Sequence, residues 1–219
     1  MRLAVIVHAK SRPPVDILIA SDGRVIVPKD PWMSDLRHQV THRVVITPEV
    51  KLCLNFRDLV WSVMLLRPND PICLLPCGDF SREAIRRGVT WCSSMDGLYT
   101  DAVLLPQGII DTWSAWKKWA TDRYVQDEDA MVAYLWSYGK RILHPVPSLA
   151  AYRTDENAQM AAPDSTWKDE EPLVCNKHLR QVGPDVLLNG MLRDELKSSY
   201  DYDNRRWISE DAKNFAPPT

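Results

Sequence analysis

Glycine is scarce in this sequence, with eight residues in 219 against sixteen prolines. Neither of the glycine-rich loops that wrap phosphate groups is present: there is no GxGxxG, and no GxxxxGK followed by Ser or Thr. A nucleotide-binding domain built on either loop is therefore disfavoured. The excess of proline indicates many stiff connections between elements.

Cysteine pairs, excess charge and long apolar runs are also missing. The five cysteines show no CxxC spacing, so the sequence lacks a zinc signature and we expect reduced, structural thiols. A formal net charge of −2 gives no global positive field for nucleic acid or anionic membrane. No stretch approaches the roughly 20 apolar residues of a transmembrane helix, and the apolar run at residues 3–7 is too short for a signal-peptide core. We therefore expect a cytoplasmic protein with no membrane partner.

Apolar runs bounded by turn residues alternate with segments of helical periodicity, which is the pattern of an α/β domain. We expect strands at residues 3–7, 24–27, 43–47, 72–75, 102–105 and 142–146. We expect helices starting at Asn55, from Ser81 to Gly88, after Pro106 and over residues 126–138, with one more at residues 184–197. Polar residues dominate after residue 153. The sequence thus predicts one domain, 1–153, and a C-terminal extension, 154–219, that packs on it.

Acidic residues gather where expected strands end and helices begin. Glu49 follows the strand at 43–47, and Asp79 follows the strand at 72–75. Three more open the helix at 126–138: Asp127, Glu128 and Asp129. Ligands of open α/β sheets bind outside the carboxyl ends of the strands, which makes these acids candidate site residues. Acids in a first helical turn are also stabilising, by about 0.3–1 kcal/mol each, so capping and general-base catalysis both stay open for the last three.

Six short segments occur in the order and spacing of one family. They are residues 5–12, 41–50 (continued by Cys53, Asn55 and Phe56), 67–71, 97–116, 126–131 and 144–149, the last containing Pro-Ser-Leu. Together they resemble small phage-type glycosyltransferases that use nucleotide sugars. The resemblance implies a GT-A-like (Rossmann-like) mixed sheet flanked by helices.

The resemblance also implies roles for particular residues. Donor-binding positions are Val7, His8, Ala9, Arg12, Asp30, Arg37 and Glu49. Without a metal, Arg12 or Arg37 could neutralise the leaving diphosphate. Acceptor-side positions are Gly97, Trp113 and Trp116, although tryptophans at this helical spacing more often pack in a core. Glu128 or Asp129 would accept the proton of the acceptor hydroxyl, while Asp127 caps the helix.

The sequence departs from the family at its metal site. Where the family has two aspartates that hold a divalent metal and the sugar diphosphate, this chain has Pro48 and Glu49. A histidine expected after Pro-Ser-Leu is replaced by Tyr152. Mg²⁺ and Mn²⁺ want several oxygen ligands. We therefore expect weak or absent metal binding, with Glu49 as the remaining ligand and Asp79 beside it if the two strand ends are neighbours.

The implied function is transfer of a sugar from a nucleotide-sugar donor to a hydroxyl acceptor, in the host cytoplasm if the chain is phage-encoded. The acceptor suggested by the resemblance is a hydroxymethylated pyrimidine in phage DNA, or alternatively a virion protein. A local C-terminal patch mixes basic and aromatic residues suited to DNA, but Asp201 and Asp203 interrupt it. The patch is Lys177, His178, Arg180, Tyr200, Tyr202, Arg205, Arg206 and Trp207. A non-catalytic binding or subunit protein that kept the fold is the rival interpretation.

Overall fold

The computed structural model describes residues 3–7, 14–20, 25–26, 40–94, 101–120, 135, 140–174, 200–201 and 206–207. Helices in these ranges are α1 (Val15–Ala20), α2 (Phe56–Leu66), α3 (Gly78–Arg87) and α4 (Gln107–Ala120). Strands are β1 (Leu3–Val7), β2 (Val25–Ile26), β3 (His42–Ile46), β4 (Val50–Leu52), β5 (Ile72–Cys73), β6 (Trp91–Ser94), β7 (Ala102–Pro106), β8 (Ile142–Pro145), β9 (Ala150–Tyr152), β10 (Leu173–Val174), β11 (Tyr200–Asp201) and β12 (Arg206–Trp207).

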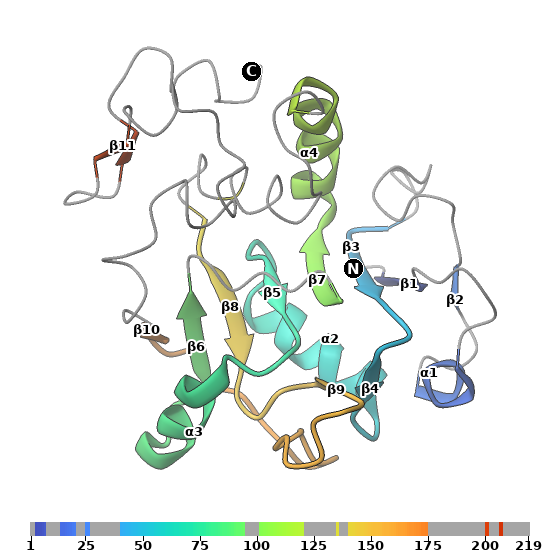
Figure 1. The fold of residues 1–219 in the computed structure, drawn as a ribbon, viewed down its shortest axis with the longest axis vertical. Helices are drawn as coiled ribbons and strands as arrows, with labels where there is room; N and C mark the ends of the chain where they lie inside the picture. The colour runs from blue at the N-terminus through green and yellow to red at the C-terminus, as the bar shows by residue number, and fades with distance from the viewer. Residues whose placement is uncertain are drawn as a thin grey trace.

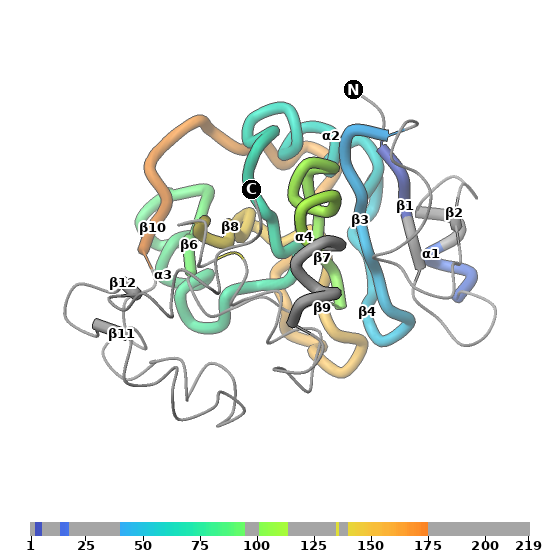
Figure 2. Tube along the Cα trace, turned by 90° about the horizontal axis from the view of Figure 1, so that it is seen from above, coloured from blue at the N-terminus to red at the C-terminus, as the bar shows by residue number. Residues whose placement is uncertain are grey.

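An eight-stranded mixed sheet forms the centre of the molecule, in the order β10-β6-β8-β5-β7-β3-β1-β2 (Figure 1). Strands β1, β2, β3, β5 and β8 run in one direction, while β6, β7 and β10 run in the other. Seen from above, β1 lies on one side and β6 and β10 on the other (Figure 2). The predicted mixed α/β sheet with flanking helices is confirmed, and it is consistent with a Rossmann-like fold. Its GT-A character stays a prediction.

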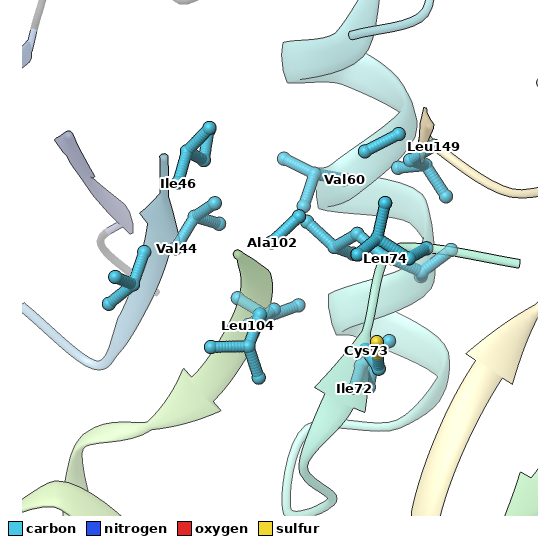
Figure 3. Packing of buried hydrophobic residues seen from close by; sticks show 14 of the residues in the cluster. Val44, Ile46, Val60, Ile72, Cys73, Leu74, Ala102, Leu104 and Leu149 are labelled. Atoms are coloured by element: carbon cyan, nitrogen blue, oxygen red, sulfur yellow. The ribbon is translucent and has the colours of Figure 1, made fainter. Parts of the chain in front are cut away.

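Helix α2 covers the middle of the sheet. Its buried side chains recur at helical spacing and make one apolar stripe: Phe56, Leu59, Val60, Val63 and Met64. Figure 3 shows Val60 facing Ala102 and Leu74. Ala102 is the first residue of β7, and Leu74 directly follows β5. These residues belong to the main hydrophobic core, so α2 is held by burial of apolar surface.

The ends of α2 and α3 show how local sequence sets helix boundaries. Asn55 precedes α2 as predicted, but it makes no side-chain cap hydrogen bond; it adopts a left-handed conformation with φ of 55°. Asparagine tolerates that conformation better than most residues. Gly88 ends α3 as predicted, with φ of 67°, and Val89 donates its N–H to the carbonyl of Ala84 over 2.9 Å. Helix α3 begins at Gly78, ahead of the predicted start at Ser81.

A small antiparallel sheet of β4 and β9 lies beside the main sheet. Val50 is paired with Tyr152, and Leu52 with Ala150. The N–H of Cys53 donates to the carbonyl of Leu149 over 3.0 Å and extends the ladder. Because β4 follows β3 and β9 follows β8, this small sheet joins the exits of two parallel strands.

Residues 160–174 pack with the rest of the fold. Ala161 and Trp167 belong to the main core, and β10 pairs with β6. Nε1 of Trp91 donates to the carbonyl of Lys168 over 2.8 Å. The start of the predicted extension is thus bound to the domain, although the boundary at residue 153 stays a prediction. The predicted helices at 126–138 and 184–197 lie outside the described residues, apart from the buried Leu135.

Candidate functional site

The carboxyl ends of β1, β3, β5 and β8 share one edge of the sheet, because these strands run in the same direction. At this edge Val7 of β1 is paired with Ile46 of β3. Figure 1 shows β4, β9 and α3 at this end of the sheet and α4 at the other. This edge is where an open α/β sheet binds its ligands.

Asp101 lies at the centre of the edge and links three segments. The antiparallel pairing of β3 with β7 brings it beside Thr47, whose N–H donates to the Asp101 carbonyl over 2.8 Å. Thr47 Oγ1 donates to Oδ1 of Asp101 over 3.0 Å, and the Tyr152 hydroxyl donates to Oδ2 over 2.8 Å. Each carboxylate oxygen therefore accepts one hydroxyl, which fixes the carboxylate beside the exit of β3. We call Thr47, Asp101 and Tyr152 the β3-exit cluster.

Arg153, the residue after β9, brings further segments to the same place. Its N–H donates to the carbonyl of Glu49 over 3.0 Å, and its Nε donates to the carbonyl of Pro48 over 2.8 Å. Its Nη2 donates to both carboxylate oxygens of Asp16 in α1, over 2.9 and 2.8 Å. The side chains of Arg153 and Asp16 are 39% and 49% exposed, so solvent reaches this ion pair.

The two candidate metal ligands are not brought together. Glu49 is exposed in the turn between β3 and β4. Asp79 lies in the first turn of α3, where it pairs with Arg82. Strand β7 separates β3 from β5, so the strand ends that precede these two acids are not neighbours.

The residues at this edge do not fit a divalent metal as the family resemblance would require. Glu49 is a single exposed carboxylate, and both oxygens of Asp101 already accept hydroxyl groups. Within the described ranges no group of three or more His, Cys, Asp and Glu side chains is placed to hold a metal ion. Mg²⁺ and Mn²⁺ are bound by several oxygen ligands, and the described residues at this edge do not supply them.

A cavity of about 370 Å³ opens between α3, the connection from β8 to β9 and the segment that follows β9. Asp79, Ser81 and Arg82 line it from α3. Ser148, Asn157 and Gln159 line it from the other side. We call it the α3 pocket. Its volume lies at the lower end of the range for small-molecule sites, about 300–1,000 Å³.

His144 lies fully buried on β8. Its Nδ1 is 3.1 Å from the carbonyl of Leu75, and its Nε2 is 3.0 Å from Oγ of Ser94. Burial lowers the pKa of His144 to about 4, so the ring is neutral near pH 7. A neutral ring that donates from Nδ1 and accepts at Nε2 satisfies both partners. His144 is therefore a structural residue.

Of the predicted acceptor-side tryptophans, Trp113 does not lie at this edge. Because β7 runs against β3, α4 begins at the opposite edge, where the Gln107 N–H donates to the carbonyl of Thr41 over 2.8 Å. Trp113 is fully buried in the main core, as the packing interpretation has it. Trp116 belongs to the same helix.

Several predicted site residues lie outside the described residues, and their placement stays a prediction. They are His8, Ala9, Arg12, Asp30, Arg37, Gly97, Asp127, Glu128, Asp129, and Lys177, His178, Arg180, Tyr202 and Arg205 of the C-terminal patch. Among the described residues, Asp101 and Arg153 are the site residues that sequence reasoning missed. Asp101 carried one local signal, since it directly precedes the strand expected at 102–105.

No protein-family model matches the chain, and no curated protein matches it. In the described part of the chain, no helix combines the length and apolar character needed to cross a membrane.

Proposed function

We propose that the chain is a glycosyltransferase that takes a sugar from a nucleotide-sugar donor and transfers it to a hydroxyl acceptor. One observation carries the proposal. The family resemblance assigns residues 48–49 and residue 152 to a single metal site that holds the sugar diphosphate, although they are far apart in sequence. In the fold they are adjacent: Val50 is paired with Tyr152, and the N–H of Arg153 donates to the carbonyl of Glu49 over 3.0 Å.

The donor lies across the carboxyl ends of β1 and β3, which are paired in parallel up to Val7 and Ile46. Glu49 projects from the turn after β3 and faces the sugar diphosphate. The β3-exit cluster gives this turn a fixed position, because Thr47 is held to Asp101 by both its backbone N–H and its side chain. A fixed turn lowers the entropic cost of positioning the donor.

In the transfer step the acceptor oxygen forms a bond to the anomeric carbon, and the bond from that carbon to the diphosphate oxygen breaks. The nucleoside diphosphate leaves with the bonding electron pair. The proton of the acceptor hydroxyl passes to the carboxylate of Glu128 or Asp129. The proposed acceptor is a hydroxymethylated pyrimidine in DNA, with a virion protein as the other acceptor class. The α3 pocket opens at the same edge and has room for the acceptor group.

Single-turnover transfer tests the proposal. Glu128→Gln and Asp129→Asn keep the size of each side chain and remove its basicity. One of the two is expected to lose about 10²–10⁴-fold in rate, with the melting temperature nearly unchanged. If both variants lose stability and neither loses rate, the acids form a helix start only and the general-base assignment is wrong.

A second candidate, a binding or subunit protein without transfer activity, is favoured by one observation. Tyr152, at the position of the expected histidine, is already bonded to Asp101, so a ligand position has become a structural crosslink. Such a protein would bind nucleotide sugars but release no nucleoside diphosphate with any acceptor. Measuring binding and product release on the same preparation separates the two candidates.

A further inference from the structure

We propose that Arg153 binds the diphosphate of the donor, and that its guanidinium group is paired with the Asp16 carboxylate when no donor is present. This assignment rests on the proposed function, and it adds a described residue to the groups that could neutralise the leaving diphosphate. Neither the family resemblance nor the sequence pattern assigns a role to Arg153.

The position of Arg153 supports the assignment. It directly follows Tyr152, the place of the expected histidine, and its main chain and side chain contact both residues at the place of the expected aspartates: the N–H donates to the Glu49 carbonyl, and Nε donates to the Pro48 carbonyl. The guanidinium is thus anchored at the exit of β3. A positive charge lies where the family resemblance implies a metal ion.

The charges at this edge require such a cation. The carboxylates of Asp16, Glu49 and Asp101 all lie on segments that Arg153 or Tyr152 contacts. Without a positive partner they would repel a diphosphate. Lys51 points its Nζ at the carbonyl of Asp155, over 2.8 Å. Among the described residues, Arg153 is the cation bonded to the turn that follows β3.

The guanidinium group is anchored through Nε, while the partner of Nη2 can be exchanged. Nε is held by a carbonyl, which fixes the plane of the group, whereas the partner of Nη2 among the described residues is the half-exposed carboxylate of Asp16. No described residue accepts from Nη1. Arginine binds carboxylates and phosphates with the same planar array of donors. Since exposed ion pairs contribute little to folding, a diphosphate can displace Asp16 without unfolding the site.

The experiment measures metal-free binding by titration calorimetry in excess EDTA. The probes are inorganic pyrophosphate, uridine and guanosine diphosphate, and their sugar conjugates. Arg153→Gln should weaken pyrophosphate binding about 10–100-fold, the range for losing a charged hydrogen-bond partner. Arg153→Lys should restore part of the affinity, because it keeps the charge and loses the planar donors. Asp16→Asn should tighten binding by about 1.5–5-fold, because it removes the competing carboxylate.

A matched pair of controls comes from α3. Arg86 also binds a single carboxylate, that of Glu83, over 2.7 and 2.6 Å, and it is likewise exposed. Arg86→Gln and Glu83→Gln make the same charge changes away from the exit of β3. Both should leave pyrophosphate affinity within twofold of the wild type. The opposite signs expected for Arg153→Gln and Asp16→Asn also exclude misfolding as the cause, because a misfolded site does not bind more tightly.

The outcomes separate this inference from the proposed function. If nucleotide sugars bind and Arg153→Gln leaves their affinity unchanged, the inference is wrong and the proposed function stands. If pyrophosphate binding depends on Arg153 but nucleotide sugars bind no more tightly than pyrophosphate, the inference stands and the glycosyltransferase proposal fails. If no probe binds the wild type at millimolar concentration, both are wrong.

Discussion

Tyr152 donates its hydroxyl to Oδ2 of Asp101 over 2.8 Å, while Oδ1 of the same carboxylate accepts from Thr47 over 3.0 Å. The carboxylate therefore fastens β9 to the exit of β3 through the start of β7. Where the family resemblance implies a histidine ligand, this chain has a phenol that crosslinks the sheet edge. The Tyr152 hydroxyl therefore helps to hold the turn that carries Glu49 in place.

Tyr152→Phe should lower the free energy of unfolding by about 1.5–3 kcal/mol, because the lost hydrogen bond has a charged acceptor. Urea unfolding with a double-mutant cycle that includes Asp101→Asn measures the coupling directly. The coupling between the two positions should be a sizeable part of the single-variant effect. Strictly additive losses would show that the hydroxyl and the carboxylate do not interact.

Stability should fall as the solution is acidified through the range set by His144. Its pKa in the fold, about 4, is below the usual value of 6.5, so the unfolded chain binds the proton first. The free energy of unfolding should therefore decrease between about pH 6.5 and pH 4, by at most about 1.4 kcal/mol per pH unit. Urea titrations at several pH values measure this slope.

His144→Gln is the non-titrating control for that slope. The variant should show a flatter pH dependence than the wild type over the same range. Some slope should remain, since burial also lowers the pKa of His42. An unchanged slope in His144→Gln would mean that other groups cause the acid sensitivity.

A buried polar link beneath α4 gives a third prediction. Arg43 is 1% exposed, and its Nε donates to Oε1 of Gln107 over 2.9 Å. Gln107→Leu should cost about 1–3 kcal/mol, because it removes the acceptor of a buried donor. Thr112→Val, on the exposed side of the same helix, should change stability by no more than about 0.5 kcal/mol. Equal effects of the two variants in urea unfolding would contradict the role of Gln107.

Trp113→Ala separates a core residue from an acceptor-binding residue. Because Trp113 is fully buried, the variant should lose about 3–5 kcal/mol of stability. The affinity of the folded fraction for nucleotide sugars should not change. A loss of transfer rate with a stability change under about 1 kcal/mol would place Trp113 in the acceptor site instead.

The elements that could be predicted from the sequence are those with a clear local pattern of apolar residues. The strands β1, β3, β7 and β8 follow from apolar runs, and α2 follows from apolar residues at helical spacing before Pro68. Strand β6 was missed, because Trp91-Cys92-Ser93-Ser94 has no β-branched residue and no alternating pattern. Strands β4 and β9 have three residues each, too few for a period to be visible.

A residue of the candidate site could be predicted only where its own segment of the chain places it at the sheet edge. Glu49 could be placed at the edge because it follows a recognisable strand. The Arg153–Asp16 pair joins residues 137 positions apart, and no local pattern announces a contact of that kind. Asp79 shows the same limit: it could join Glu49 only if their two strand ends were neighbours, and β7 lies between β5 and β3. The order of strands in a sheet depends on tertiary packing and has no local signal in the sequence.

The measurement that tests the account most directly is the melting temperature of the wild-type protein with nucleotide sugars in excess EDTA. Uridine and guanosine diphosphate sugars are compared with the matching free sugars and nucleosides. At ten times the dissociation constant, a ligand of the folded state adds about 1.4 kcal/mol, which corresponds to a rise of about 3–6 °C for a chain of this size. Such a rise is expected with at least one nucleotide sugar, and no rise is expected with the free sugars. No rise with any nucleotide sugar at millimolar concentration would contradict the proposed function.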